Sequence, residues 1–261
     1  MERYNVSFTG AGKVAGALVK VLHKTGFTIQ TIVSKTEENG RRLADSCNAE
    51  WSDRLSFPDS THIIIIAVPD KQLKTVLKNL NCSPDTLVVH TAGSLGLDVF
   101  PDSLKRKGVL YPLQTFSKDR NIDFHDLPFF LEASDNESLE ILKYITGAIG
   151  GKTWIIDASQ RKILHVAAVF VNNFTNHMLT TGKDIASTAG LPFSIFDSLI
   201  KETYSKALEQ GPEKSQTGPA IRNDYNTIDN HLNLLSFSAE IKSIYKEVTQ
   251  SIIHYYKGKE K

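Results

Sequence analysis

Val6-Ser7-Phe8-Thr9-Gly10-Ala11-Gly12-Lys13-Val14-Ala15-Gly16 lies near the start of the chain and decides the fold. A short apolar run leads into a G-x-G-x-x-A motif and then into an amphipathic segment, which is typical of a dinucleotide-binding turn. The first glycine permits the tight turn, the second lets the backbone approach a pyrophosphate, and Ala15 lets the helix pack closely. We therefore expect Gly10, Ala11, Gly12, Lys13 and Val14 to contact a pyrophosphate at a helix N-terminus.

The first 156 residues alternate short apolar runs with amphipathic segments, which predicts βαβ units and a mostly parallel sheet. The run from Ile63 to Val68 is apolar at every position, so we expect a central strand buried on both faces. The expected strands are 5–9, 28–33, 62–68, 86–90, 108–113, 129–132 and 152–156. The expected helices are 13–24, 37–46, 71–79 and 136–149.

The pattern changes after Ile156. Residues 159–189 contain no proline and show helical spacing of apolar residues, and Gly190-Leu191-Pro192 then ends the helix. Further helices are expected at 193–210 and 236–256, with a polar segment at 211–226. The predicted fold class is therefore α/β. A Rossmann-type domain over 1–156 is followed by an all-helical domain over 157–261, which begins with a long interdomain helix.

Composition gives a second set of expectations. Lys and Arg number 30 against 29 Asp and Glu, and a net charge of +1 gives no reason to expect nucleic acid or a membrane surface as partner. Two cysteines offer no disulfide framework, which indicates a reducing compartment. No signal peptide is visible and the longest aliphatic run is far shorter than a membrane span, so we expect a cytoplasmic protein.

The end of the second predicted strand indicates which dinucleotide is used. An NAD-binding chain usually carries an acid there to bind the ribose hydroxyls. This chain carries Ser34, Lys35 and Thr36, which could donate hydrogen bonds to a 2′-phosphate or neutralise it. We therefore expect NADP, with NAD less favoured. Arg41 and Arg42 could add charge, although a solvated helix face explains them equally well.

Two further strand ends face the same predicted crevice, because open α/β sheets bind ligands at the carboxyl ends of their strands. We expect cofactor contacts from Ala67, Val68, Pro69, Thr91, Ala92 and Gly93, and a substrate contact from Ser94. Ordinary βα turns are the competing interpretation of each residue. His90 ends an apolar strand and is interpreted as a structural histidine.

The predicted long helix carries polar residues in an apolar setting. His165, Asn172 and Asn176 are spaced by seven and four, which places them on one face of a regular α-helix, and Asn173 and His177 lie on the adjoining strip. Buried amides and imidazoles need partners. Two interpretations are open: the side chains line a substrate cleft, or they bond to other helices in a polar core or dimer interface. The cleft is favoured for His165 and Asn172, as catalytic residues.

A polar segment near the end of the chain offers a second group. Thr217, Gly218 and Arg222 could contact a small anionic substrate, and we group Asn176 with them as a substrate contact. The alternative is a connecting loop whose Asp224 caps the next helix. A metal site built from His165, His177 and His231 lacks any recognised ligand spacing, and no metal is expected.

The whole chain resembles NADP-oxidoreductase-like proteins that join a Rossmann domain to a helical domain of unknown function. More distantly it is similar to pyrroline-5-carboxylate reductase, the deazaflavin-dependent NADP oxidoreductases and the 6-phosphogluconate dehydrogenase superfamily. The residues that carry the resemblance are Gly10–Gly16, Ala67–Asp70, His90–Ser94, Tyr111–Phe116, Leu164–Ala168, Asn172–Phe174 and Gln216–Ala220.

The resemblance implies a helical C-terminal domain that forms a homodimer and an active site between the domains. In the 6-phosphogluconate dehydrogenase group a lysine and an asparagine on the interdomain helix handle the substrate. His165 stands where that lysine is expected, seven residues before Asn172, so lysine chemistry is in doubt and a histidine could serve instead.

These observations predict an NADP-dependent oxidoreductase that transfers a hydride between nicotinamide and a small carbonyl or imine. His165 would donate or accept the proton and Asn172 would orient the substrate. The alternative is a non-catalytic NADP-binding sensor or partner-binding protein, which the fold alone does not exclude. A structural dimer with a degenerate pocket and a deazaflavin reductase are further possibilities.

Overall fold

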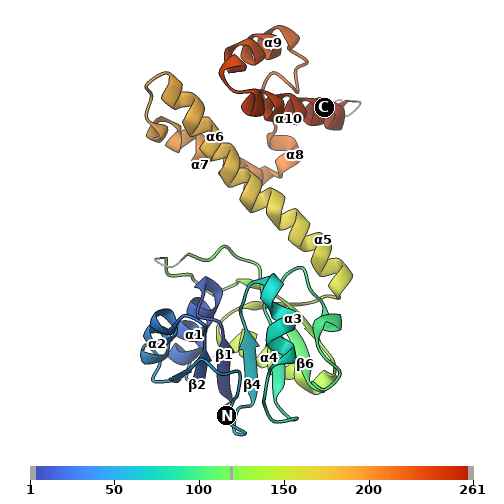
Figure 1. Ribbon diagram of the computed structural model, residues 1–261. Helices are drawn as coiled ribbons and strands as arrows, with labels where there is room; N and C mark the ends of the chain where they lie inside the picture. The colour runs from blue at the N-terminus through green and yellow to red at the C-terminus, as the bar shows by residue number, and fades with distance from the viewer. Residues whose placement is uncertain (1–3, 118–119, 258–261) are drawn as a thin grey trace. The chain divides into compact units, whose positions relative to one another are not determined.

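The structure is a computed structural model that describes residues 4–117 and 120–257 (Figure 1). The chain divides into two compact units, Met1–Asn173 and Phe174–Lys261. This division lies within the helical part of the chain, whereas the predicted domain boundary after Ile156 marks the end of the last strand.

The first unit is built on an eight-stranded sheet with the order β3-β2-β1-β4-β5-β6-β7-β8. Among the strands that the structure describes, β6 and β7 pair antiparallel and the other neighbours pair parallel, which confirms the predicted mostly parallel α/β fold. The strands are β1 (Asn5–Thr9), β2 (Thr28–Val33), β3 (Glu50–Ser52), β4 (Ile63–Ile66), β5 (Leu87–His90), β6 (Lys107–Pro112), β7 (Pro128–Ala133) and β8 (Lys152–Ile155).

Strand β4 lies at the centre of the sheet and is buried on both faces, as predicted. Ile63 and Ile65 pack into one hydrophobic core, and Ile64 and Ile66 pack into the other. Successive side chains of a strand point to opposite faces, so an unbroken apolar run fits only a strand that is covered on both sides.

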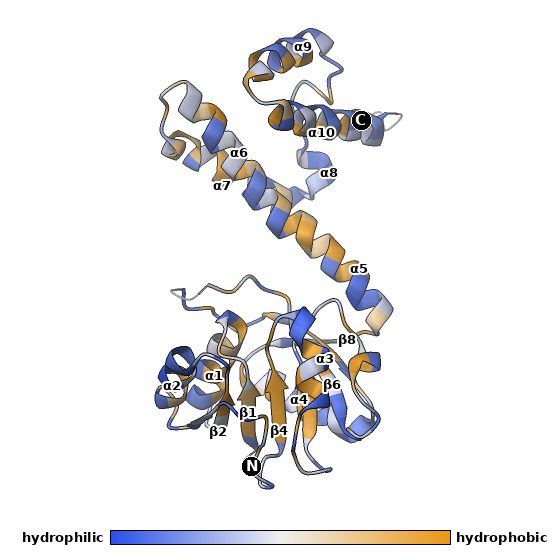
Figure 2. Ribbon diagram, in the orientation of Figure 1, coloured by the Kyte–Doolittle hydropathy of each residue, from blue (hydrophilic) through white to orange (hydrophobic). Residues whose placement is uncertain are grey.

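Helices cover both faces of the sheet. One core receives side chains of α1 (Lys13–Lys24), α2 (Glu37–Asp45) and α4 (Asn136–Ala148), and the other receives side chains of α3 (Asp70–Lys78) and the short helix η1 (Leu97–Val99). The hydropathy colouring shows the apolar central strands between these helices (Figure 2).

The strand order reverses direction between β1 and β4, which is the switch point of this topology. Their ends are joined by a hydrogen bond from the Ala67 amide to the Thr9 carbonyl, 2.8 Å, and the Gly10 amide donates to Val33, 2.7 Å. The turns after β1, β2 and β4 are therefore held side by side at one edge of the sheet.

The segment predicted as one regular helix over 159–189 contains a different helical turn. It consists of α5 (Ala158–Ala168), the π-helical segment η2 (Val169–Phe174) and α6 (Thr175–Thr188). Residues of η2 include Val171, Asn172 and Asn173, whose types are weak helix formers. A π turn holds more residues than an α turn. The prediction that His165, Asn172 and Asn176 lie on one face assumed a regular α-helix, and the α-helix that carries His165 ends at Ala168.

The rest of the second unit is helical. Its further elements are η3 (Phe193–Phe196), α7 (Asp197–Gln210), α8 (Pro212–Ser215), α9 (Tyr225–Leu234), η4 (Leu235–Phe237) and α10 (Ala239–Tyr256). The last predicted helix therefore begins later than expected, after Ser238, whose hydroxyl accepts from the Ile241 amide at 3.3 Å. Across residues 4–117 and 120–257, no helix has the length and apolar character that a membrane span requires.

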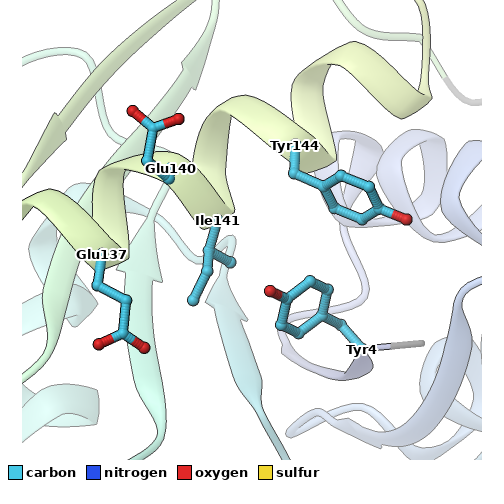
Figure 3. Close-up of a pocket in the computed structure, with 5 residues that line it drawn as sticks. All are labelled: Tyr4, Glu137, Glu140, Ile141 and Tyr144. Atoms are coloured by element: carbon cyan, nitrogen blue, oxygen red, sulfur yellow. The ribbon is translucent and has the colours of Figure 1, made fainter. Parts of the chain in front are cut away.

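A cavity of about 340 Å³ lies at the opposite edge of the sheet, beside the start of β1. It is lined by Tyr4 and by side chains of α4 (Figure 3). Its two carboxylates already have basic partners, since Glu137 pairs with Arg106 and Glu140 with Lys143. This cavity is remote from the switch point.

Candidate functional site

The turn between β1 and α1 has the geometry that its glycines predict. Gly10 has φ of +105°, and a Cβ there would lie 2.3 Å from the Ala67 carbonyl oxygen, so only glycine fits without strain. A Cβ at Gly12 would meet no atom of the described chain within 4 Å. Gly12 is the N-cap of α1, whose first turn has neither a side-chain cap nor an acidic residue. The amides of this turn can therefore bind an anion.

Ser34, at the end of β2 and expected to contact a 2′-phosphate, has hydrogen-bond partners within the protein. The Ser34 hydroxyl donates its proton to the Thr36 carbonyl at 2.9 Å and accepts a hydrogen bond from the Trp51 indole at 3.1 Å. A hydroxyl has one proton, so buried Ser34 is not free to donate to a phosphate in this arrangement. Lys35 and Thr36 are exposed beside it. Arg41 stacks on Trp51 and pairs with Glu37.

The ends of β4 and β5 lie next to each other. Ala67 and Val68 are half-buried, Pro69 is exposed as the N-cap of α3, and the Thr91 amide donates to the Ile66 carbonyl at 3.2 Å. Thr91 and Ala92 are half-buried, whereas Gly93 is buried. The structure therefore gathers the predicted cofactor residues of the two strand ends along one stretch of the sheet edge.

Buried groups fix the loop that follows β5. The His90 ring accepts a hydrogen bond from the Ala92 amide at Nδ1, 3.2 Å, so its neutral form carries a proton on Nε2, which lies 3.4 Å from the Gly96 carbonyl. Burial lowers the pKa of His90 from 6.5 to about 4; the Gly96 contact opposes this shift and the charge of Arg161 adds to it. His90 is therefore a neutral structural residue.

The Ser94 side chain is held by the first residue of the helix that follows β4. Its hydroxyl donates to the Asp70 carboxylate at the start of α3. Both side chains are accessible to solvent, since Asp70 is exposed and Ser94 is half-buried. The predicted substrate residue Ser94 is therefore hydrogen-bonded to a carboxylate to which the sequence analysis gave no site role.

An imidazole and a phenol meet above Gly93. The Tyr111 hydroxyl at the end of β6 lies 3.2 Å from Nδ1 of His165 on α5, and the two rings meet edge to face with centroids 6.1 Å apart. A Cβ at Gly93 would lie 2.8 Å from both His165 Nδ1 and Tyr111 Cζ. Glycine at this position is therefore what lets the pair approach the end of β5.

The first turn of α5 is anchored to the sheet. Arg161 is fully buried, and its guanidinium contacts the Glu132 carboxylate of β7 and the Leu95 carbonyl, each at 2.7 Å. Asp157 caps the same helix through a capping box with Gln160. Because His165 follows Arg161 by one helical turn, this anchor fixes where its imidazole lies.

The remaining predicted site residues are distributed over both units. Asn172 is exposed in η2 within the first unit, and Asn176, Thr217, Gly218 and Arg222 belong to the second unit. Thr217 lines a mostly apolar cavity of about 310 Å³ there, together with His231 and Tyr245. Asp224 caps α9 by accepting from the Thr227 amide at 3.1 Å, as the loop interpretation predicted.

His165 belongs to the first unit, whereas His177 and His231 belong to the second. Among the residues that the structure describes, no three His, Cys, Asp or Glu side chains are grouped to hold a metal ion.

Sequence reasoning gave no site role to Tyr111, Asp70, Arg161 or Glu132, although Asp70 and Tyr111 lie in stretches that carry the family resemblance. Tyr111 had the same signal as the residues that were chosen, because it stands near the end of a predicted parallel strand. Arg161 and Glu132 lie 29 positions apart, and nothing local marks their pairing.

The sheet topology and the glycine turn after β1 together define a Rossmann-type class of protein. The sequence matches two family models: residues 1–115 match a Rossmann-like domain, and residues 127–252 match a domain of unknown function, DUF2520. The chain belongs to the family that combines these two domains.

Several solved structures are similar to this chain over nearly its full length. A proposed NADP oxidoreductase from Bacteroides fragilis is 37% identical, with a TM-score of 0.88 over 97% of this chain and 98% of that chain. A Thermotoga maritima protein is 25% identical, with a TM-score of 0.72 over 97% and 99%. A reductive aminase from Aspergillus terreus in complex with NADPH and ethyl-5-oxohexanoate is 12% identical, with a TM-score of 0.73 over 97% and 95%. The last likeness shows the fold alone. Among proteins with curated descriptions, none matches the chain in sequence.

Proposed function

We propose that this protein is an NADP-dependent oxidoreductase that transfers a hydride between nicotinamide and a small carbonyl or imine compound. One observation carries the proposal: the Tyr111–His165 pair lies against Gly93, in the row of strand ends that begins with the anion-binding turn at Gly12. His165 would then act as the proton-transfer group on the side of the strand ends away from β2, where the nicotinamide half of a dinucleotide would lie.

The chain's residues fit a dinucleotide. Gly10, Ala11, Gly12, Lys13 and Val14 would hold the pyrophosphate at the open first turn of α1. Lys35 and Thr36 would hold the 2′-phosphate, with Ser34 shaping the site through its bonds to Thr36 and Trp51. The residues Ala67, Val68, Pro69, Thr91, Ala92 and Gly93 would contact the nicotinamide half. The proposed NADP oxidoreductase from Bacteroides fragilis supports this choice of cofactor.

NADPH, when bound, supplies the hydride. His165 would supply the proton to the substrate oxygen or nitrogen, or remove it in the reverse direction, because an imidazole transfers protons near neutral pH. Ser94 and Asn172 would orient the substrate. The contacts expected from Asn176, Thr217, Gly218 and Arg222, and the cytoplasmic location, stay predictions.

A substrate panel tests the activity. Loss of reduced nicotinamide is followed spectroscopically with small aldehydes, cyclic imines, and small ketones with and without a primary amine. Turnover of one class should fall by roughly 10²- to 10⁴-fold in His165→Gln. His254→Gln, an exposed histidine of α10, is the matched control and should keep the wild-type rate. NADPH binding without turnover of any substrate would instead favour a non-catalytic NADP-binding protein.

The second unit supports association of two copies through the C-terminal helices. Within its described residues the buried hydrophobic side chains are Ala186, Ala220, Ile228 and Leu235. Leu208 and Leu234 are 87% and 74% exposed, and a unit with so small a core gains stability by covering such side chains. A homodimer follows as part of the proposal.

Light scattering after size exclusion tests the dimer. Wild type should have the mass of two chains, and Leu208→Glu or Leu234→Glu should shift it toward one. Lys201→Glu on the same helix as Leu208 alters charge without removing an apolar side chain and should leave the mass unchanged. A wild-type protein of single-chain mass at every concentration would contradict the dimer.

A further inference from the structure

We infer that Tyr111 fixes the tautomer of His165, with the proton on Nε2, and delivers a proton to Nδ1 when Nε2 gives its own to the substrate. This inference rests on the proposed function and assigns Tyr111 as a positioning residue that acts through His165. This tautomer defines what His165 can do first: its Nε2 carries a proton, so it donates to the substrate rather than accepting a proton from it.

The phenol is the donor in this pair. Burial, and then the charge of Asp70, raises the pKa of Tyr111, so the hydroxyl keeps its proton at neutral pH. Among the described residues, the hydrogen bond that the Tyr111 hydroxyl makes is the one with His165 Nδ1. If Nδ1 instead carried the proton, the half-buried phenol would have no protein acceptor for its own, which is costly.

The site also leaves Nε2 open. No hydrogen bond to His165 Nε2 is made by any residue in the described part of the chain, and the ring is half-buried rather than enclosed. Gly93 lies beneath the Nδ1 side, so the loop after β5 supports the tyrosine side of the ring. A substrate carbonyl or imine would therefore meet an N–H group.

The proposed proton transfer breaks two bonds and forms two. The Nε2–H bond of His165 breaks as an O–H or N–H bond forms on the reduced substrate. The O–H bond of Tyr111 breaks as an Nδ1–H bond forms, which leaves a phenolate that water reprotonates. A phenol is ordinarily a stronger acid than the alcohol formed from a carbonyl, which favours this transfer, and burial raises the pKa of Tyr111 and so reduces that advantage.

Nuclear magnetic resonance tests the tautomer without cofactor or substrate. The full chain is labelled with ¹⁵N-histidine, the His165 ring is assigned from the spectrum of His165→Gln, and long-range ¹H–¹⁵N correlations are recorded at pH about 8.5, where an ordinary imidazole is neutral. Wild type should show the Nε2–H pattern for His165, and Tyr111→Phe should shift it toward a mixture of tautomers.

The chain provides a matched control. In the second unit, the Tyr245 hydroxyl lies 2.8 Å from His231 Nδ1, and the rings meet edge to face as they do in the first pair. Tyr245→Phe should change the His231 signals and leave those of His165 unchanged. Thermal unfolding of Tyr111→Phe checks that β6 and its neighbours stay folded.

An Nδ1–H pattern for His165 in wild type, or an unchanged pattern in a folded Tyr111→Phe protein, would overturn the inference even if NADPH-dependent turnover is found. If turnover is found, Tyr111→Phe should lower kcat by roughly 10- to 100-fold with little change in KM. An unchanged kcat would overturn the proton delivery. Failure of the substrate panel, with the Nε2–H tautomer observed, would count against the proposed function and not against the pairing.

Discussion

The guanidinium of Arg161 lies 2.7 Å from the carboxylate of Glu132 and joins the first turn of α5 to strand β7. Arg161 is fully buried, whereas the Glu132 side chain is 20% exposed, and the same guanidinium holds the Leu95 carbonyl of the loop after β5. One side chain therefore connects the sheet, the loop that carries Gly93 and Ser94, and the helix that carries His165.

Removing the arginine should destabilise the first unit. Arg161→Met leaves a carboxylate and a carbonyl without their partner, and we expect a loss of about 3 kcal/mol in the free energy of unfolding. Trp51 and Trp154 both lie in this unit, so denaturant unfolding followed by tryptophan fluorescence reports on it. Lys143→Met, which removes an exposed pair with Glu140, is the control and should cost less than about 1 kcal/mol. Equal losses in the two variants would contradict the anchoring role.

The first two glycines of the motif should respond differently to alanine. Gly10→Ala forces a Cβ against the Ala67 carbonyl in a positive-φ conformation, so we expect a loss of about 1–3 kcal/mol in stability by tryptophan fluorescence. Gly12→Ala meets open space and should change stability by less than about 1 kcal/mol. Gly147→Ala in α4, which also meets open space, controls for the loss of a glycine in a helix. A large loss in Gly12→Ala would show that this turn has a structural role.

Gly93→Ala should disturb the imidazole–phenol pair. The new Cβ would lie 2.8 Å from both rings, so one or both must move away from the end of β5. We expect shifted His165 ring signals by nuclear magnetic resonance and a lower kcat with any substrate found. Wild-type ring signals in this variant would mean that the pair does not rest on Gly93.

Acid should destabilise the first unit through His90. Its pKa in the folded state, about 4, lies below the ordinary value of 6.5, so the unfolded chain binds the proton more tightly. The contribution of His90 to the free energy of unfolding should therefore be constant above about pH 6.5 and fall as the pH drops toward 4, by at most about 3 kcal/mol. His90→Asn should have a flatter profile in this range. Parallel profiles for the two proteins would contradict this origin.

Local sequence patterns predicted much of this fold. The apolar run at 63–68 identified a strand covered on both faces, which ends at Ile66, and the glycine motif identified the turn after β1, because each depends on residues that are close in sequence. Strand β3 was missed, since its three residues at the sheet edge are too few to show a pattern. The π-helical segment η2 was also missed, because regular apolar spacing does not distinguish it from an α-helix.

Less of the candidate site than of the fold could be predicted from the sequence. Ser34 has the right residue type to bind a phosphate, but only the structure shows that its proton is used by Thr36. The contact of Tyr111 with His165 joins residues 54 positions apart, and the Arg161–Glu132 pair likewise depends on how the helix meets the sheet. Such tertiary contacts decide which polar side chains can act together.

Calorimetric titration with NADPH and NADH tests the central claim most directly. Wild type should bind NADPH more tightly than NADH. Lys35→Ala should lose about tenfold in affinity for NADPH but little for NADH, because the proposed partner of the lysine is the 2′-phosphate, which NADH lacks. Gly12→Ala, with its fold intact, should weaken both. If folded wild-type protein binds neither nucleotide, the proposed cofactor site and the oxidoreductase function are contradicted together.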